Sequence, residues 1–381
     1  MTRLIAGFIP LLDCASLVAA SECGFAAREG LELTLVRETS WANIRDRLIV
    51  GHFDVAHMLG PMAVASTLGV GHLKVPIAAP CSLGLGGNAL AVSLRLWERM
   101  TREGAAPGSH PKIQGIALKR VLAARAREDL GALTFGIVYP FSCHNYELRY
   151  WLAASGVDPD RDVRLVVIPP PLLADAMRAG QIDGFCAGEP WSSVAVDSRL
   201  AAIVTPTAAI WPQSPEKVLG CRAEWAADHG EELAALVRAV YRAALWCERP
   251  ENHAELAMLL AQPRHVGIAP QLLRRGLSGQ LTLTPGGESR ELDGFFLPAS
   301  RWATFPWTSH ALWYYTQMVR WRQVELVAEH LSQAAGTYRP DIYRAALAPL
   351  GVELPRGDSK IEAFFDNRVF DPGELVSWLG R

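Results

Sequence analysis

The sequence from Val163 to Val196, VRLVVIPPPLLADAMRAGQIDGFCAGEPWSSVAV, carries the clearest signal for the fold. Five of its first six residues are apolar, and four of these are β-branched, which predicts a buried strand over Val163–Ile168. Three prolines end that strand, and helical spacing follows over Leu172–Ala179 until a glycine stops it. A second strand begins near Ile182 and runs into the sequence GEPW. We therefore expect two parallel strands joined by a helix, with a ligand at their carboxyl ends.

The same order of elements occurs earlier in the chain. Leu31–Val36 is predicted to be a strand, and Ser40 is a suitable N-cap for a helix over Asn43–Val50. Phe53–Met58 then forms the next strand. Because 381 residues are too many for one ordinary core, this repetition indicates two α/β lobes.

Composition excludes several classes of protein. Half of the residues are hydrophobic, a fifth are charged and the net charge is −2, which is typical of a globular chain without a nucleic-acid or anionic-membrane footprint. The seven cysteines are an odd number and include no CxxC, so we expect neither a disulfide framework nor a zinc site. No apolar run is long enough to span a bilayer.

The N-terminal sequence MTRLIAGFIPLLDCASLVAA is similar to a signal peptide in having a basic start and apolar residues. Pro10 and Asp13 interrupt the apolar region, however, and Asp13 stands where a lipoprotein signal needs a small residue. A strand over Leu4–Phe8 followed by a helix accounts for the segment better. We therefore expect no signal peptide and a cytoplasmic location.

Three further features suggest a ligand site. The segment CSLGLGGN, residues 81–88, would expose backbone N–H groups to a ligand or serve as a flexible crossing between lobes, and it is not a P-loop. His144 follows the strand Thr134–Tyr139, where it would be a ligand donor or a helix cap. Lys217 is the only lysine between Lys119 and Lys360 and lies near a return crossing, although a solvated surface charge is the plainer interpretation.

Several motifs together resemble the nitrate/bicarbonate-binding proteins of ABC importers. They are SWANIRDRL from Ser40, IPPPLLADAMRAGQIDGFCAGEPW from Ile168, EKVLGCRAEW from Glu216, WYYTQMVRW from Trp313 and FFDNRVFDP from Phe364. The resemblance implies an α/β, bilobal, type II periplasmic-binding-protein-like fold with two mixed sheets flanked by helices and a ligand cleft between the lobes. It places lobe one at residues 1–88 and 216–381, lobe two at 89–215, and the hinge near 88–93 and 215–222.

The resemblance also implies a set of residues that bind an anion. The ligand-binding residues it indicates are Trp41, Gly84, Asn88, His144 and Lys217. The residues expected to form the cleft wall or a second layer are Gly86, Pro170, Gly188, Glu189 and Pro190. Asn88 stands where the family has glutamine, which is one methylene longer. Glu189 would repel an anion, so we expect it to pair with Lys217 or an arginine, or to cap the helix after Pro190.

The resemblance implies a binding protein without enzymatic activity, cofactor or metal. The sequence shows no metal cluster, nucleophile elbow or cofactor fingerprint, which argues against a small lyase on the same fold. With no signal peptide expected, the chain is similar to cytoplasmic nitrate/nitrite sensors of the NasS type. Such a sensor would regulate nitrate assimilation by releasing an ANTAR-domain RNA-binding antiterminator when nitrate or nitrite binds. The alternative is the substrate-binding component of an ABC importer for nitrate, bicarbonate or a sulfonate.

Overall fold

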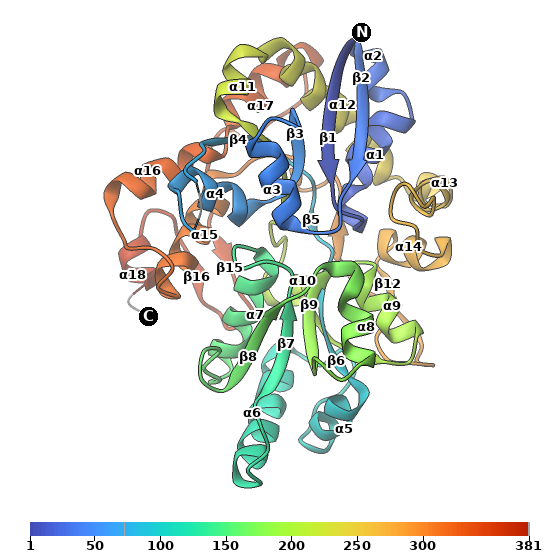
Figure 1. Cartoon of the computed structure of the whole chain (residues 1–381), viewed down its shortest axis with the longest axis vertical. Helices are drawn as coiled ribbons and strands as arrows, with labels where there is room; N and C mark the ends of the chain where they lie inside the picture. The colour runs from blue at the N-terminus through green and yellow to red at the C-terminus, as the bar shows by residue number, and fades with distance from the viewer. Residues whose placement is uncertain (72, 380–381) are drawn as a thin grey trace.

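Two five-stranded mixed sheets organise the molecule, one in each lobe (Figure 1). The computed structural model describes residues 1–71 and 73–379. Sheet one has the order β2 (Leu31–Arg37), β1 (Thr2–Phe8), β3 (Val55–Leu59), β11 (Lys217–Arg222), β4 (Ile77–Ser82). Sheet two has the order β10 (Ala201–Pro206), β6 (Asn88–Ser93), β9 (Gly184–Gly188), β7 (Leu133–Ile137), β8 (Val163–Val167). We call the sheet-one half lobe one and the sheet-two half lobe two.

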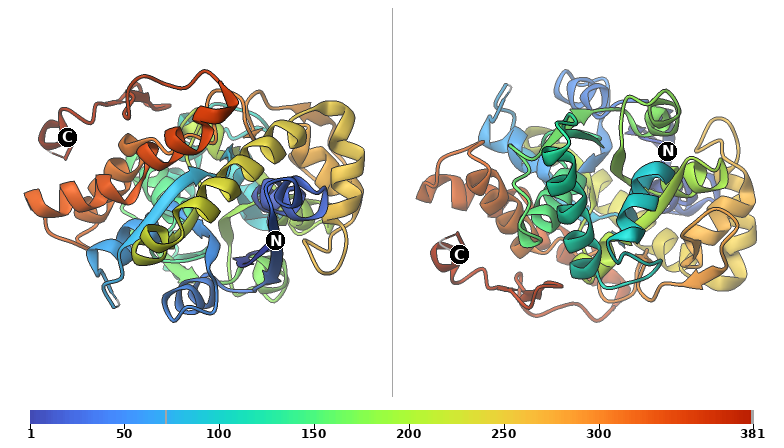
Figure 2. Two further views of the ribbon diagram at one scale, coloured as in Figure 1. Left: turned by 90° about the horizontal axis from the view of Figure 1, so that it is seen from above. Right: turned by 90° about the horizontal axis from the view of Figure 1, so that it is seen from below.

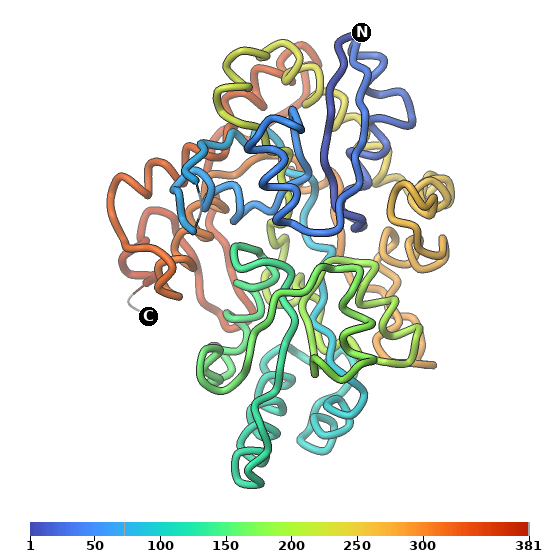
Figure 3. The backbone as a smooth tube through the Cα atoms, in the orientation of Figure 1, coloured from blue at the N-terminus to red at the C-terminus, as the bar shows by residue number. Residues whose placement is uncertain are grey.

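One strand of each sheet connects the lobes. In sheet one, β1, β2 and β3 run parallel, whereas β11 is antiparallel to both β3 and β4. In sheet two, β7, β8 and β9 run parallel, whereas β6 is antiparallel to β9 and β10. The antiparallel strands β6 and β11 are the ones that begin directly after the chain passes between the lobes (Figure 3). Residues at the starts of β6 and β11 therefore lie between the two halves.

Helices cover both sheets. Lobe one carries α1 (Ala15–Glu22), α2 (Phe25–Arg28), α3 (Trp41–Ile49), α4 (Gly60–Leu68), α11 (Ala223–Asp228), α12 (Gly230–Cys247), α13 (His253–Leu260), α14 (Pro270–Leu277), α15 (Thr308–Arg320), α16 (Ala328–Thr337) and α17 (Pro340–Leu347). Lobe two carries α5 (Leu94–Arg102), α6 (Pro111–Arg127), α7 (Cys143–Ala154), α8 (Leu173–Arg178), α9 (Trp191–Asp197) and α10 (Thr207–Ile210). Seen from above, α12 and the C-terminal helices lie over lobe one (Figure 2). Among the residues described, no helix is both long and apolar enough to cross a membrane.

The C-terminal region holds small β pairs that touch both lobes. These pairs are β12 (Gln280–Thr282) with β13 (Ser289–Glu291), β14 (Phe296–Leu297) with β5 (Leu85–Gly86), and β15 (Glu362–Ala363) with β16 (Val369–Phe370), before α18 (Leu375–Leu379). Ile203 of β10 donates its N–H to the carbonyl of Leu283 at 2.8 Å, and Phe365 donates to Ile210 at 2.9 Å. The C-terminal region, which the resemblance assigns to lobe one, thus packs against lobe two as well.

The stretch from Val163 to Val196 agrees with expectation in one respect and differs in another. The two strands are parallel as predicted, because β8 and β9 both run parallel to β7, which lies between them. The strand predicted as buried is β8, which lies at the edge of sheet two, so only Val163 at its start is fully buried. Apolar β-branched residues favour a strand in either place, and the sequence of one strand does not give its neighbours.

The start of α3 and the end of α15 both follow from the residues at those positions. The helix α3 begins at Trp41, and the Ser40 hydroxyl accepts the N–H of Asn43 as predicted. The chain leaves α15 after Arg320, and Arg322 has φ 57°, in the left-handed region that a helix cannot continue through.

Candidate functional site

Four of the five residues predicted to bind an anion lie at the beginning of an element. Trp41 begins α3, Asn88 begins β6, His144 is the second residue of α7, and Lys217 begins β11. All four are buried, and they come from both lobes. Strand and helix starts that face the gap between two sheets bring polar groups together there, which is why this part of the predicted site is assembled.

Lys217 is the central charge of the site. Its Nζ lies 2.6 Å from Oδ2 of Asp13 and 3.0 Å from Oε2 of Glu216, and all three side chains are buried. Burial opposes the ammonium form, but the two carboxylates outweigh it and raise the pKa of Lys217. Burial alone would raise the pKa of Asp13, yet Lys217 and His57 hold that pKa below its usual range. The ammonium and the Asp13 carboxylate are therefore both charged at neutral pH.

Asp13 and His57 belong to the site although the sequence did not identify them. Nε2 of His57 lies 2.9 Å from Oδ1 of Asp13, and its ring centroid is 5.4 Å from that of Trp41. The Lys217 ammonium lies 5.8 Å from the centroid of the Trp41 ring, within cation–π range. A signal existed for both residues: Asp13 follows the carboxyl end of β1, and His57 is a polar residue within the buried strand β3.

A second group of polar side chains surrounds Glu216. Oε1 of Glu216 accepts a hydrogen bond from Nδ2 of Asn88, and Oε2 accepts one from the Cys143 thiol at 2.6 Å. Nδ2 of Asn88 also lies 3.4 Å from Oε2 of Glu147. Burial raises the pKa of Glu147 well above its usual range, and the neighbouring Glu216 adds to the effect. Burial also raises the pKa of Glu216, while Lys217 opposes that increase.

His144 is placed as predicted, but it does not carry a charge. Its Nε2 lies 3.9 Å from Oε2 of Glu216, too far for a hydrogen bond, and this nitrogen has no hydrogen-bond partner in the described part of the chain. Burial lowers the pKa of His144 well below 6.5, and the Lys217 ammonium adds to that effect. The ring is a neutral group that can donate through one nitrogen.

We therefore expect the imidazole of His144 not to titrate between about pH 6 and 8.5. The measurement is the pH dependence of its ring ¹³C chemical shift, with free imidazole in the same tube as the reference that does titrate. Because its low pKa comes from burial beside Lys217, the shift of His144 should stay constant over this range. A midpoint above pH 6 would contradict the neutral assignment.

The glycine segment contributes less than expected. Gly84 has φ 102°, and a Cβ there would lie 3.1 Å from the carbonyl oxygen of Leu297 and 3.2 Å from the ring of Phe296. Close approach of β14 therefore explains this glycine without an anion. The N–H of Gly86 donates to the Ser214 carbonyl at 2.8 Å, so the prediction that it would be offered to a ligand is wrong.

The predicted cleft-wall residues lie at two different places. Gly188 is paired with Asn88 across β9 and β6, and a Cβ on Gly188 would be 3.1 Å from Oδ1 of Asn88. Of the roles expected for Glu189, helix capping is the one found, because its Oε2 accepts the N–H of Ser193 at 3.3 Å. Burial raises the pKa of Glu189 to about 7. Pro190 follows a cis peptide bond, while Pro170 lies after the edge strand β8, away from β6.

The lobes are joined by hydrogen bonds around these residues. The N–H of Leu12 donates to the Glu189 carbonyl at 2.7 Å, and Nε1 of Trp191 donates to the Pro10 carbonyl at 3.1 Å. On another side the Tyr146 hydroxyl donates to Oε1 of Gln323 at 2.6 Å. These bonds join the two lobes around a group of buried charges, and burial strengthens the interactions among those charges.

The donor set does not favour a metal ion. Cys143, His144 and Glu216 offer ligand atoms within 4.8 Å of one another, and all three are buried. The Lys217 ammonium lies 3.0 Å from the same Glu216 oxygen that a metal would use. A fixed positive charge at that distance repels a cation and attracts an anion.

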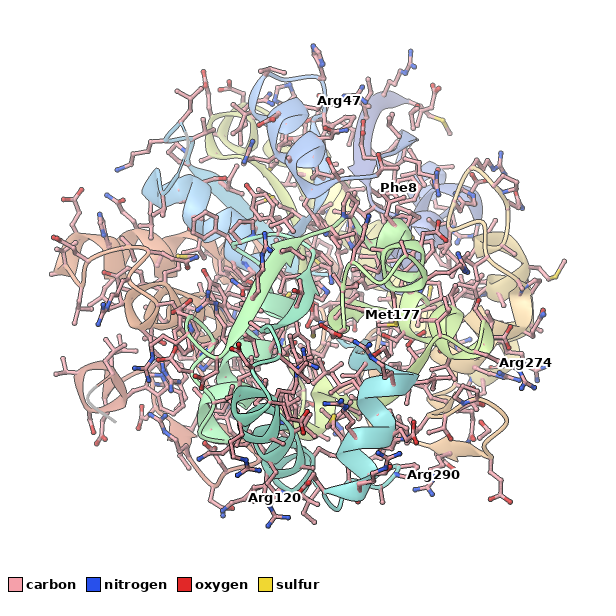
Figure 4. The ribbon with its side chains drawn as sticks, turned by 60° about the horizontal axis from the view of Figure 1, so that its bottom comes forward. Phe8, Arg47, Arg120, Met177, Arg274 and Arg290 are labelled. Carbon is pink, nitrogen blue, oxygen red and sulfur yellow. The ribbon has the colours of Figure 1, made fainter. Side chains whose placement is uncertain are left out.

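The labelled arginines Arg47, Arg120, Arg274 and Arg290 all lie at the rim of the molecule (Figure 4).

Comparison with known proteins gives consistent findings. The sequence model of the NMT1-like family matches residues 1–261. The nitrate/nitrite binding protein NrtA of Synechococcus elongatus is 33% identical, over 98% of this chain and 84% of its own length. The bicarbonate transport ATP-binding protein CmpC of the same species is 34% identical over 98% of this chain, which spans about half (54%) of the length of CmpC. NrtC of Synechocystis, a nitrate import ATP-binding protein, is also matched over 54% of its length.

The fold agrees with a solved structure. The periplasmic nitrate-binding protein NrtA from Synechocystis PCC 6803 superposes with a TM-score of 0.92, covering 100% of this chain and 98% of its own, at 27% identity. The predicted α/β, bilobal, periplasmic-binding-protein-like fold is confirmed by this match. The prediction of a binding protein without enzymatic activity is confirmed by relatives that are named for binding.

Proposed function

The chain belongs to the NMT1-like family, alongside nitrate- and bicarbonate-binding proteins, and from this premise we propose that it binds a small planar oxoanion between its lobes. Nitrate, nitrite and hydrogencarbonate are the candidates. The proposal concerns the site formed by Trp41, Asn88, His144 and Lys217.

The observation that carries the proposal is a set of buried hydrogen-bond donors beside one ammonium group. Nε1 of Trp41 and Nε2 of His144 have no hydrogen-bond partner among the residues described, and both side chains are at most 1% exposed. An unpartnered buried polar group costs about 1–3 kcal/mol, so such groups are retained where a ligand can satisfy them. Together with Lys217 they offer one positive charge and directional N–H groups, which suits a monovalent anion.

The relatives favour the importer alternative over the sensor interpretation. NrtA, CmpA, NrtC and CmpC are named for nitrate or bicarbonate binding, import or transport. We therefore propose that the chain is the substrate-binding part of an ABC importer. A cytoplasmic location and release of an ANTAR-domain antiterminator remain the second proposal, and they rest on the sequence alone. Fractionation of cells, and co-purification with and without about 1 mM nitrate, well above a micromolar Kd, separate the two.

Titration calorimetry with nitrate, nitrite, hydrogencarbonate and sulfate tests the function directly. We expect at least one of the three planar anions to bind with one-to-one stoichiometry and micromolar affinity, roughly −8 kcal/mol, and sulfate to bind much more weakly. Absence of heat and of any thermal shift with all three planar anions at millimolar concentration would refute the proposal.

A further inference from the structure

We propose that the Glu216 carboxylate is a tethered competitor, which occupies the position of the anion and restricts the site to planar oxoanions. The inference deepens the proposed function and rests on it. It assigns a role to a residue that is not among those expected to bind the ligand.

The first support is the set of groups that face this carboxylate. Of the five residues predicted to hold the anion, Asn88, His144 and Lys217 all point at the Glu216 carboxylate, from β6, α7 and β11. The Cys143 thiol adds a further donor at 2.6 Å. Asn88, Cys143 and Lys217 therefore donate to one carboxylate, which can accept all three when it is ionised, while His144 faces it without a hydrogen bond. Two of the donors expected for a ligand, Asn88 and Lys217, are already in use.

The second support is the shape of the group. A carboxylate is planar, carries one negative charge and spreads it over oxygens bonded to one trigonal carbon. Nitrate, nitrite and hydrogencarbonate have the same local geometry, whereas sulfate and sulfonates are tetrahedral. Donors arranged around the Glu216 carboxylate are consequently arranged for a planar oxoanion as well.

The third support is charge balance. Lys217 is already neutralised by Asp13 at 2.6 Å and by Glu216 at 3.0 Å, with all three groups buried. An anion that entered while Glu216 stayed in place would put a third negative charge beside one ammonium, which a desolvated site does not tolerate. Asp13 is bonded to Lys217 and His57, whereas the Glu216 carboxylate is bonded to both Asn88 and Lys217, two of the donors that the anion needs. Glu216 is therefore the group that an incoming anion would displace.

The backbone of Glu216 is anchored, so its side chain can move alone. Its carbonyl accepts the N–H of Gly60 at 3.0 Å, and β11 begins at the next residue. Rotation about the side-chain bonds would withdraw the carboxylate without displacing the strand. The apparent Kd for the anion is then the intrinsic Kd divided by the fraction of time that the donors are free of the carboxylate, as for any site that is only partly competent.

The test compares anion affinity in the wild type and in Glu216→Gln by calorimetry with nitrate, nitrite and hydrogencarbonate. If the carboxylate holds the donors 90–99% of the time, its neutralisation should tighten binding by about 10- to 100-fold. Glu362→Gln is the matched control, because Glu362 is also a buried carboxylate, paired with His310 at 3.0 Å outside this site. Its anion affinity should not change.

A second variant separates competition from a structural effect. In Glu216→Ala the space of the carboxylate is empty, so added formate should bind there and compete with nitrate, whereas it should have little effect on the wild type. Two outcomes would overturn this inference alone. In one, the wild type binds a planar anion but Glu216→Gln binds it equally or more weakly; in the other, formate has no effect on Glu216→Ala. Absence of binding of any planar anion to all three proteins would overturn the proposed function, and the inference with it.

Discussion

Replacing Lys217 with methionine is expected to weaken anion binding by about 30-fold or more, which corresponds to a loss of 2 kcal/mol or more. The ammonium is buried and pairs with the carboxylates of Asp13 and Glu216 at this site. Methionine preserves the length and most of the volume of the side chain but offers no charge and no N–H donor. Calorimetry with the anion that the wild type binds best gives the measurement.

A control is needed to separate lost anion binding from a lower stability of the Lys217→Met protein. Without Lys217 the carboxylates of Asp13 and Glu216 are left facing each other, so the single variant will also be less stable. The double variant Asp13→Asn with Lys217→Met keeps the net charge of the buried group and should fold while failing to bind. Lys74→Met, at an exposed lysine bonded to Gln333, should bind normally. Unchanged affinity in the double variant would show that Lys217 does not hold the anion.

Asp13→Asn should lower the free energy of unfolding by about 3–5 kcal/mol, the usual cost of breaking a buried ion pair. The Asp13 carboxylate lies 2.6 Å from Nζ of Lys217 and 2.9 Å from Nε2 of His57, and the Asp13 side chain is only 5% exposed. Its pKa is depressed in the folded state, so this stabilisation is fully present above the unfolded pKa near 3.9 and disappears as the pH falls through the folded pKa. Urea denaturation at pH 7 measures the loss.

The matched control is an aspartate whose ion pair is exposed. Asp175 pairs with Arg178 within α8, and both side chains are mostly solvent-accessible. Asp175→Asn should change the free energy of unfolding by less than about 1 kcal/mol, because exposed pairs contribute little. Equal effects at Asp13 and Asp175 would mean that the buried group does not stabilise the fold.

The elements that hold the site could be predicted from local sequence because each carries its own signal. Ser40 caps α3 as its residue type indicates, and the apolar run before His144 is the strand β7. Strand position could not be obtained in this way. Val163–Val167 is an edge strand, and β7 separates it from β9, because neighbours in a sheet are chosen by contacts distant in sequence.

The site was only partly predictable because some of its residues are brought together by contacts between distant parts of the sequence. The family resemblance led to Trp41, Asn88, His144 and Lys217, which the structure brings together. It did not assign a role to Glu216, although this residue begins the motif EKVLGCRAEW, because the carboxylate meets Asn88 and Cys143 from segments distant in the sequence. Asp13 was interpreted only as an interruption of a leader-like segment, since its partners are 44 or more residues away in the chain.

A crystal structure of the complex with the tightest-binding anion would show whether a planar oxoanion binds at the Lys217 ammonium between the lobes. We expect density for the anion within hydrogen-bond distance of Lys217 Nζ, with Nε1 of Trp41 or Nε2 of His144 as a further donor, and with the Glu216 carboxylate turned away. An anion bound elsewhere, with Glu216 still bonded to Lys217 and Asn88, would contradict the account.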